Sequence, residues 1–147
     1  PCCLVGSEMC IRDRKYPDST DINWKQVDLY SISSTTKALQ GADIAIYLVH
    51  SMMPSTRLNQ GNFEDTDILL ADNFSRAAQD CNLKQIIYVG GILPKDDHTI
   101  SKHLKSRYEV EKTLGSRNTP LTSIRAGIII GPNGSSFRVF STCSNAP

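Results

Sequence analysis

Apolar segments with β-branched residues recur along this chain, and their alternation with helix-forming segments constrains the fold more than any other feature. Residues 42–50 (ADIAIYLVH) are almost wholly apolar, which is typical of a strand covered on both faces. Residues 85–89 and 121–130 have the same character, and residues 26–30 predict a shorter strand. The chain therefore holds four predicted strands.

Helices are predicted between these strands. Residues 33–40 form a helix that stops at Gly41, and residues 101–114 form one that stops at Gly115. Residues 63–80 carry their apolar side chains at helical spacing. Strands separated by single helices predict an α/β fold, with a parallel sheet, right-handed crossovers and helices on both faces.

The composition is that of an ordinary globular domain. The chain has 147 residues, 39% of them hydrophobic, and a formal net charge of +1, which suits one domain with a real core. This charge implies no surface field that would hold nucleic acid or an anionic membrane. The apolar stretches are also too short to cross a bilayer. We therefore expect neither nucleic acid nor membrane as a partner.

The cysteines point to no metal site. Cys2, Cys3 and Cys10 lie in the first ten residues, whereas Cys81 and Cys143 are isolated. None of them has the spacing of a zinc site. Isolated cysteines in such a domain suit a reducing compartment, so we expect a cytoplasmic protein.

The N-terminal segment differs from the rest of the chain. Residues 3–14 (CLVGSEMCIRDR) resemble the in-frame translation of a transposase adapter used in sequencing libraries. They are too few and too charged for a signal peptide. The alternative is a short native strand at residues 2–5. We assign residues 1–14 as foreign and residues 15–147 as the C-terminal part of one domain whose own start is missing.

Four motifs in order carry a family resemblance. They are YLVHSM at residues 47–52, QIIYVGG at 85–91, SKHLKSRYEVEKTL at 101–114 and IRAGIIIGPNGSSF at 124–137. Together they resemble the atypical short-chain dehydrogenase/reductases, close to the NmrA-like and the epimerase/dehydratase branches. The resemblance implies a Rossmann-type, doubly wound parallel sheet and NAD(P) as the cofactor of the full-length protein.

Ligands of such sheets bind beyond the carboxyl ends of the strands. The family places its catalytic serine or threonine at the end of one strand, where this chain has two glycines without a hydroxyl. The cofactor positions implied by the resemblance are Asp28 and Leu29 at the adenine, Val49, His50 and Ser51 beneath the cofactor, Gly90 and Gly91 at that strand end, and Ala126, Gly127 and Ile128 at the nicotinamide.

The glycine-rich turn that opens the family's domain is absent. Its backbone N–H groups hold the cofactor's pyrophosphate. Residues 131–134 (GPNG) cannot replace it, because they follow the last strand rather than the first. The first β-α unit is therefore missing, and its strand would separate residues 26–30 from residues 42–49. We expect this chain by itself to bind little or no NAD(P)H.

Tyr108 and Lys112 spell Y-x-x-x-K, the acid and its partner in active short-chain dehydrogenases. They lie on the opposite side of the helix from the apolar face marked by Val110. His103 and Arg107 share that apolar face, and the resemblance gives the same register. The functional positions thus read H-x-x-x-R, and we expect Tyr108 and Lys112 to be solvent-exposed.

His103 and Arg107 are the candidate catalytic residues. The Arg107 guanidinium suits a ribose hydroxyl or a phosphate, and an imidazole exchanges protons near neutral pH. The alternative is an exposed helix with a basic face. His50 has a similar alternative, as a hydrogen-bonded structural residue.

Three functional interpretations follow. The first is an NAD(P)-dependent oxidoreductase or epimerase-like enzyme with a small-molecule substrate. The second is a regulator or sensor of the NmrA-like kind, which binds NAD(P)H without catalysis. The unmatched Ser-Tyr-Lys set favours the second interpretation or an enzyme with unusual acid–base groups. The third is an incomplete gene product without activity.

Overall fold

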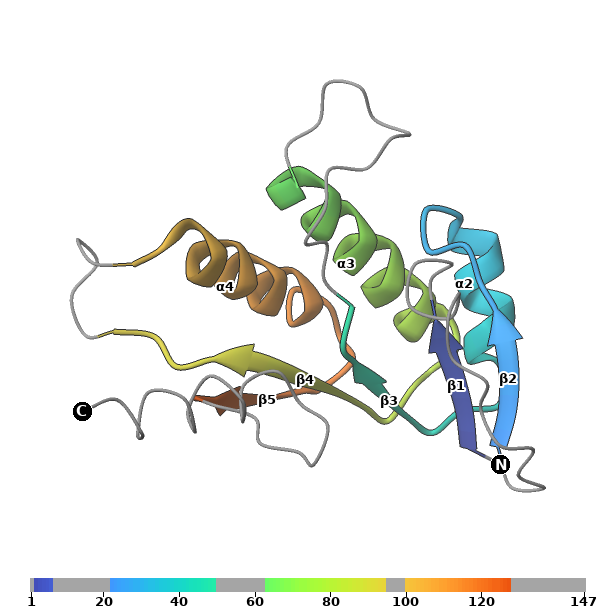
Figure 1. The fold of residues 1–147 in the computed structure, drawn as a ribbon. Coiled ribbons are helices and arrows are strands. Elements are labelled where there is room, and N and C mark those ends of the chain that lie inside the picture. Colours follow the sequence, from blue (N-terminus) through green and yellow to red (C-terminus); the bar gives the residue numbers. More distant parts are fainter. Residues whose placement is uncertain (1, 7–21, 50–62, 95–99, 128–147) are drawn as a thin grey trace, which may run out of the picture.

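The computed structural model describes residues 2–6, 22–49, 63–94 and 100–127. Figure 1 shows their arrangement. In chain order the elements are β1 (Cys2–Gly6), β2 (Ile22–Gln26), α2 (Ile32–Leu39), β3 (Ile44–Tyr47), α3 (Phe63–Asp80), β4 (Gln85–Gly91), α4 (Lys102–Leu114) and β5 (Leu121–Ala126). Among these described helices, none has the length and apolar character needed to span a bilayer.

The central sheet is parallel, in the order β3-β4-β5. Ile46 of β3 lies opposite Ile87 of β4, and Ile87 lies opposite Thr122 of β5. The predicted α/β class and the adjacency of these three strands are therefore confirmed. β1 and β2 form a second, two-stranded parallel sheet, and β2 is not hydrogen-bonded to β3.

α3 and α4 lie on one face of the central sheet, and α2 packs beside α3 on the same side (Figure 1). Along β3, Ala45 and Tyr47 are buried beneath the helices, whereas Ile44 and Ile46 are 54% and 62% exposed. The prediction of a strand covered on both faces is therefore wrong for this chain. The physical reason is that no described helix lies on the second face.

The core lies between the helices and the covered face. The Tyr47 ring packs edge-on against Phe74 of α3, with the ring centroids 4.9 Å apart. Ile86 of β4 and Leu114 of α4 are completely buried. Among the apolar side chains at helical spacing in residues 63–80, Leu70, Phe74, Ala77 and Ala78 are in this cluster. Their helical spacing in the sequence is therefore confirmed as the packing stripe of α3.

β2 ends earlier than the sequence predicted. A strand was expected at residues 26–30, but β2 is Ile22–Gln26, and a turn follows it. In this turn the backbone N–H of Tyr30 donates to the Asp28 carboxylate, and that of Ser31 donates to the Asp28 carbonyl, each at 3.1 Å. Ser31 then caps α2. An Asp that bonds its own turn in this way ends the extended conformation.

The N-terminal segment is described only at Cys2–Gly6, where β1 forms the short strand that was the alternative interpretation of this region. β1 pairs with β2 and takes no part in the central sheet. Residues 7–14 lie outside the described residues. The assignment of residues 1–14 as foreign stays a prediction.

Candidate functional site

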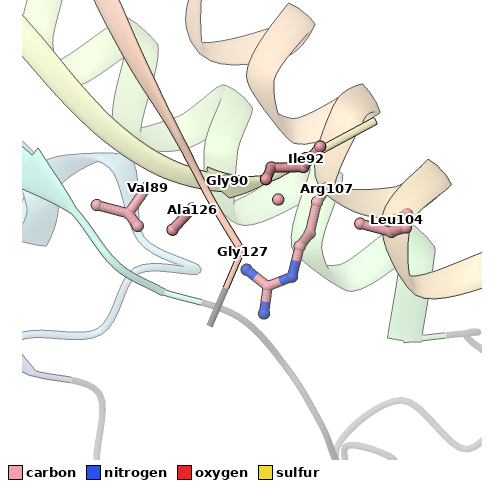
Figure 2. Close-up of a pocket in the computed structure, with 8 residues that line it drawn as sticks. Val89, Gly90, Ile92, Leu104, Arg107, Ala126 and Gly127 are labelled. Carbon is pink, nitrogen blue, oxygen red and sulfur yellow. The ribbon is translucent and has the colours of Figure 1, made fainter. Parts of the chain in front are cut away.

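A cavity of about 430 Å³ opens at the carboxyl ends of β4 and β5. This is the edge at which ligands bind in parallel α/β sheets. Helix α4 forms the opposite wall, as Figure 2 shows. The lining residues are Val89, Gly90, Gly91, Ile92, Leu104, Arg107, Ala126 and Gly127.

Arg107 alone carries a charge among these lining residues. Its side chain leaves α4 and points into the cavity between the ends of β4 and β5 (Figure 2). Arg107 is half-buried, so its planar guanidinium is partly shielded from water yet reachable from the cavity. Such a group binds phosphate, carboxylate or paired hydroxyl oxygens. The structure therefore places Arg107 where the sequence predicted a cofactor contact.

Tyr88 anchors the part of α4 that carries Arg107. Its hydroxyl donates to the Arg107 carbonyl at 3.2 Å, and Tyr88 is only 2% exposed. Burial raises the pKa of the Tyr88 phenol, against a smaller opposing effect of Arg107. The phenol thus stays protonated at neutral pH and keeps its donor role. This bond ties β4 to α4 immediately behind the cavity.

Because β4 ends in two glycines, Gly90 and Gly91, backbone atoms form the floor of the cavity. A Cβ on Gly91 would lie 2.7 Å from Cδ2 of Leu104, and one on Gly90 would lie 3.0 Å from a Tyr88 ring carbon. Leu104 therefore fills the space of the side chain that Gly91 lacks. The floor offers a ligand peptide groups and apolar surface, but no hydroxyl at the position where the resemblance implied a serine or threonine.

An ion pair borders the cavity where α4 meets β5. The Arg125 guanidinium donates to the Glu111 carboxylate at 2.9 Å. The Glu111 hydrogen bond and charge raise the pKa of Arg125. The Glu111 carboxylate would also lie 3.7 Å from a Cβ on Gly90. Glu111 is thus held beside the cavity floor, one helical turn after Arg107.

His103 is not among the lining residues, and it is exposed. The sequence predicted His103 beside Arg107 at the strand ends, but of these two residues the structure places only Arg107 in the cavity lining. The prediction oriented the helix by its apolar stripe, Val110 and Leu114. In the structure Leu104 and Arg107 mark the cavity side of α4, and they lie on average about 70° around the helix from that stripe. His103 and Tyr108 flank the cavity side at similar angles.

Tyr108 is half-buried rather than exposed, which corrects half of the expectation for Tyr108 and Lys112. Lys112 is exposed, as predicted, and its Nζ lies 4.3 Å from the centre of the Tyr108 ring. This cation–π contact, rather than solvent alone, covers the ring. Neither residue lines the cavity.

The other predicted site residues lie in different surroundings. Gly90, Gly91, Ala126 and Gly127 line the cavity with Arg107. Asp28 is exposed beyond the end of β2, whereas Leu29 is buried in the core. Val49 follows β3 and packs half-buried against the core. His50, Ser51 and Ile128 lie outside the described residues. The cofactor roles of all these positions stay predictions.

Sequence reasoning missed the cavity residues Leu104 and Ile92 and the anchoring residue Tyr88. The spacing of Leu104 and Arg107, three residues apart on a helix, was a signal that both share one side. The signal for Tyr88 was weaker. Tyr88 follows Ile86 by two positions, so both side chains lie on the face of β4 that the helices cover.

No model of a known protein family matches the chain. One curated relative is the "Auxiliary protein GraX" of Staphylococcus aureus, which is 29% identical over 111 residues. The match covers 74% of this chain and 32% of GraX, so the chain spans about a third of that relative.

Solved structures with a similar fold include the Bordetella bronchiseptica enzyme WbmH in complex with NAD+. Its TM-score is 0.68 at 17% identity, over 95% of this chain and 53% of WbmH. The Citrobacter sp. triphenylmethane reductase complexed with NADP(H) has a TM-score of 0.58 at 20% identity, over 84% and 39% of the two chains. A nucleoside-diphosphate-sugar epimerase of Staphylococcus aureus has a TM-score of 0.56 at 19% identity, over 72% of this chain and 34% of the epimerase. The Rossmann-type fold expected from the four motifs is therefore confirmed.

Proposed function

We propose that this chain is part of an NAD(P)-binding oxidoreductase or epimerase-like enzyme, and that the cavity at the ends of β4 and β5 receives the nicotinamide half of the cofactor. The observation that carries this proposal is the Arg107 side chain in a cavity floored by the backbone of Gly90, Gly91 and Gly127. Similar folds that hold NAD+ and NADP(H) support it.

The residues present suit a dinucleotide at this place. The guanidinium of Arg107 can donate two hydrogen bonds to ribose hydroxyl or phosphate oxygens. Glycines at the strand ends allow a planar ring to approach the backbone closely, because no Cβ stands in the way. Leu104 and Ile92 add apolar surface to the lining. The cofactor, once bound, supplies hydride transfer, while the protein binds and orients it.

A proton-transfer group for the reaction has to come from outside the described cavity lining. Among the described lining residues, none carries a hydroxyl, an imidazole or a carboxylate. His103 flanks the cavity from the first turn of α4 and stays our candidate, together with Arg107 as the group that stabilises developing negative charge. The named reductases and epimerases among the similar structures support the catalytic interpretation over a regulator that only binds the cofactor.

The test is Arg107→Ala in the complete protein, with NADPH affinity measured by fluorescence titration. Loss of a desolvated, charge-assisted hydrogen bond of about 1.5–3 kcal/mol predicts affinity roughly 10- to 150-fold weaker. Lys112→Ala is the matched control, because it removes an exposed cation from the same helix outside the cavity. The NADPH affinity of the Lys112→Ala protein should equal that of the parent protein.

The same proteins are then assayed for NADPH oxidation with quinone and dye acceptors. Turnover that falls with Arg107→Ala supports an enzyme. Unchanged NADPH affinity in Arg107→Ala would contradict the proposed site. Tight NADPH binding without turnover on any acceptor would favour the regulator.

A further inference from the structure

A buried amide on α3 holds the turn that follows β2. Asn73 is 5% exposed, and its Nδ2 donates to the backbone carbonyls of both Leu29 and Tyr30, each at 3.0 Å. The two donors of one side chain thus satisfy two successive peptide groups. These contacts join residues 43 and 44 positions apart in the chain.

The turn needs this partner. Leu29 is buried in the core, and buried carbonyls that lack a donor are strongly destabilising. An asparagine in the interior of a helix is likewise unfavourable unless its polar group is bonded. The two hydrogen bonds satisfy both the backbone carbonyls and the Asn73 amide, and they fix the position of the turn relative to α3.

Two further contacts then define the position of Asp28. Its carboxylate accepts from the backbone N–H of Tyr30 at 3.1 Å, and its own N–H donates to the Ser34 hydroxyl at 3.4 Å. Tyr30 is therefore held from two sides, by Asn73 at its carbonyl and by Asp28 at its N–H. A displacement of the Leu29–Tyr30 backbone would carry the exposed Asp28 side chain with it.

We propose that Asn73 is a positioning residue for the adenosine end of the bound dinucleotide, acting through the Leu29–Tyr30 backbone on Asp28 at the carboxyl end of β2. This inference rests on the proposed function, to which we add that Asp28, at the adenine position that the resemblance implies, contacts the adenosine half while Arg107 contacts the nicotinamide half. Asn73 touches neither half itself. Its loss should weaken only those ligands that contain adenosine.

The test compares two ligands on the complete protein, namely NADPH and reduced nicotinamide mononucleotide, which lacks the adenosine half. Asn73→Leu keeps a similar volume but removes both donors. We expect NADPH affinity to fall about tenfold, because the turn that carries Asp28 is no longer held in place against α3. Affinity for the mononucleotide should stay within about twofold, because Arg107 and the cavity are untouched.

Two more variants protect the test against misfolding. Asn73→Ser is smaller, retains one donor, and should show a lesser loss for NADPH only. Ser75→Ala is the matched control on α3, since Ser75 is completely buried and its hydroxyl has no hydrogen-bond partner within the described part of the chain. It should leave both affinities unchanged.

Equal weakening of both ligands in the Asn73 variants would show a purely structural role and overturn the inference. Unchanged NADPH affinity would overturn it as well. Both results leave the proposed function intact, because the parent protein still binds NADPH. Failure of the parent to bind NADPH at all would overturn the proposed function, and this inference with it.

Discussion

Individual side chains of α4 divide between the cavity and the surface. Arg107 reaches the cavity because its carbonyl is fixed by Tyr88, and because Leu104, one turn earlier, fills the space beside Gly91. Tyr108 is the next residue along the chain, yet about 100° of helix rotation takes it out of the cavity lining. Adjacent positions in the sequence therefore lie in different surroundings.

Tyr108→Phe should change NADPH affinity and any turnover by less than about twofold in the complete protein. The substitution removes a hydroxyl outside the cavity and keeps the ring on which Lys112 lies, so the cation–π contact survives. Steady-state kinetics beside the Arg107→Ala variant check this. Abolished turnover in Tyr108→Phe, with a silent Arg107→Ala, would restore Y-x-x-x-K as the catalytic pair.

At the scale of elements, helix ends decide where strands begin. α2 ends at Leu39, and Gly41 then adopts a φ of +79°, a left-handed conformation that turns the chain toward β3. α3 ends in a similar way, with Asn82 at a φ of +53°. These turns start β3 and β4 on the same side of the molecule, as parallel strands require.

Gly41→Ala should lower the free energy of unfolding by about 1–2 kcal/mol. A Cβ at this position would meet nothing within 4 Å, so the whole effect arises from the backbone conformation. Urea unfolding followed by circular dichroism measures it. Lys37→Ala, an exposed change within α2, serves as the control and should lie within about 0.5 kcal/mol of the parent. An equally stable Gly41→Ala protein would refute the explanation.

At the scale of the whole molecule, the second face of the central sheet is apolar and uncovered by any described element. Its side chains are uncharged, and its two polar groups, Gln85 and Thr122, are hydrogen-bonded to each other at 2.6 Å. Residues of this face that are at least half exposed are Ile44, Ile46, Leu48 and Ile124. An apolar surface of this kind, beside the open edge of β3, favours association.

We therefore expect the 147-residue chain alone to self-associate, to be of low stability, and to bind NADPH weakly or not at all. Ile46→Lys should reduce the association seen in analytical ultracentrifugation without loss of helical signal, because Ile46 is 62% exposed. Ile86→Lys places the same charge in the core of β4 and should unfold the chain. A monodisperse parent chain, or micromolar NADPH binding in calorimetry, would contradict this expectation.

The sequence by itself determined the three strands of the central sheet, the helices that precede and separate them, and their order. Apolar periodicity identified β3, α3, β4, α4 and β5, and the bounds of α3 agree with the prediction at both ends. Gly41 and Gly115 marked helix ends correctly, because these signals are local in the chain. Strand-helix alternation sufficed for the parallel sheet and for the expectation of a binding site at its carboxyl edge, where the structure has a cavity lined by Arg107, Gly90 and Gly91.

Only the tertiary structure decided which faces are covered and which side of a helix meets the site. An apolar strand has the same composition whether one or both of its faces are packed, so the bare side of β3 could not be foreseen. The apolar stripe of α4 orients that helix toward the core rather than toward the cavity, which is why Leu104 was missed and His103 misplaced. Asn73 meets the turn after β2 across 43 intervening positions, and no local pattern encodes a contact of that range.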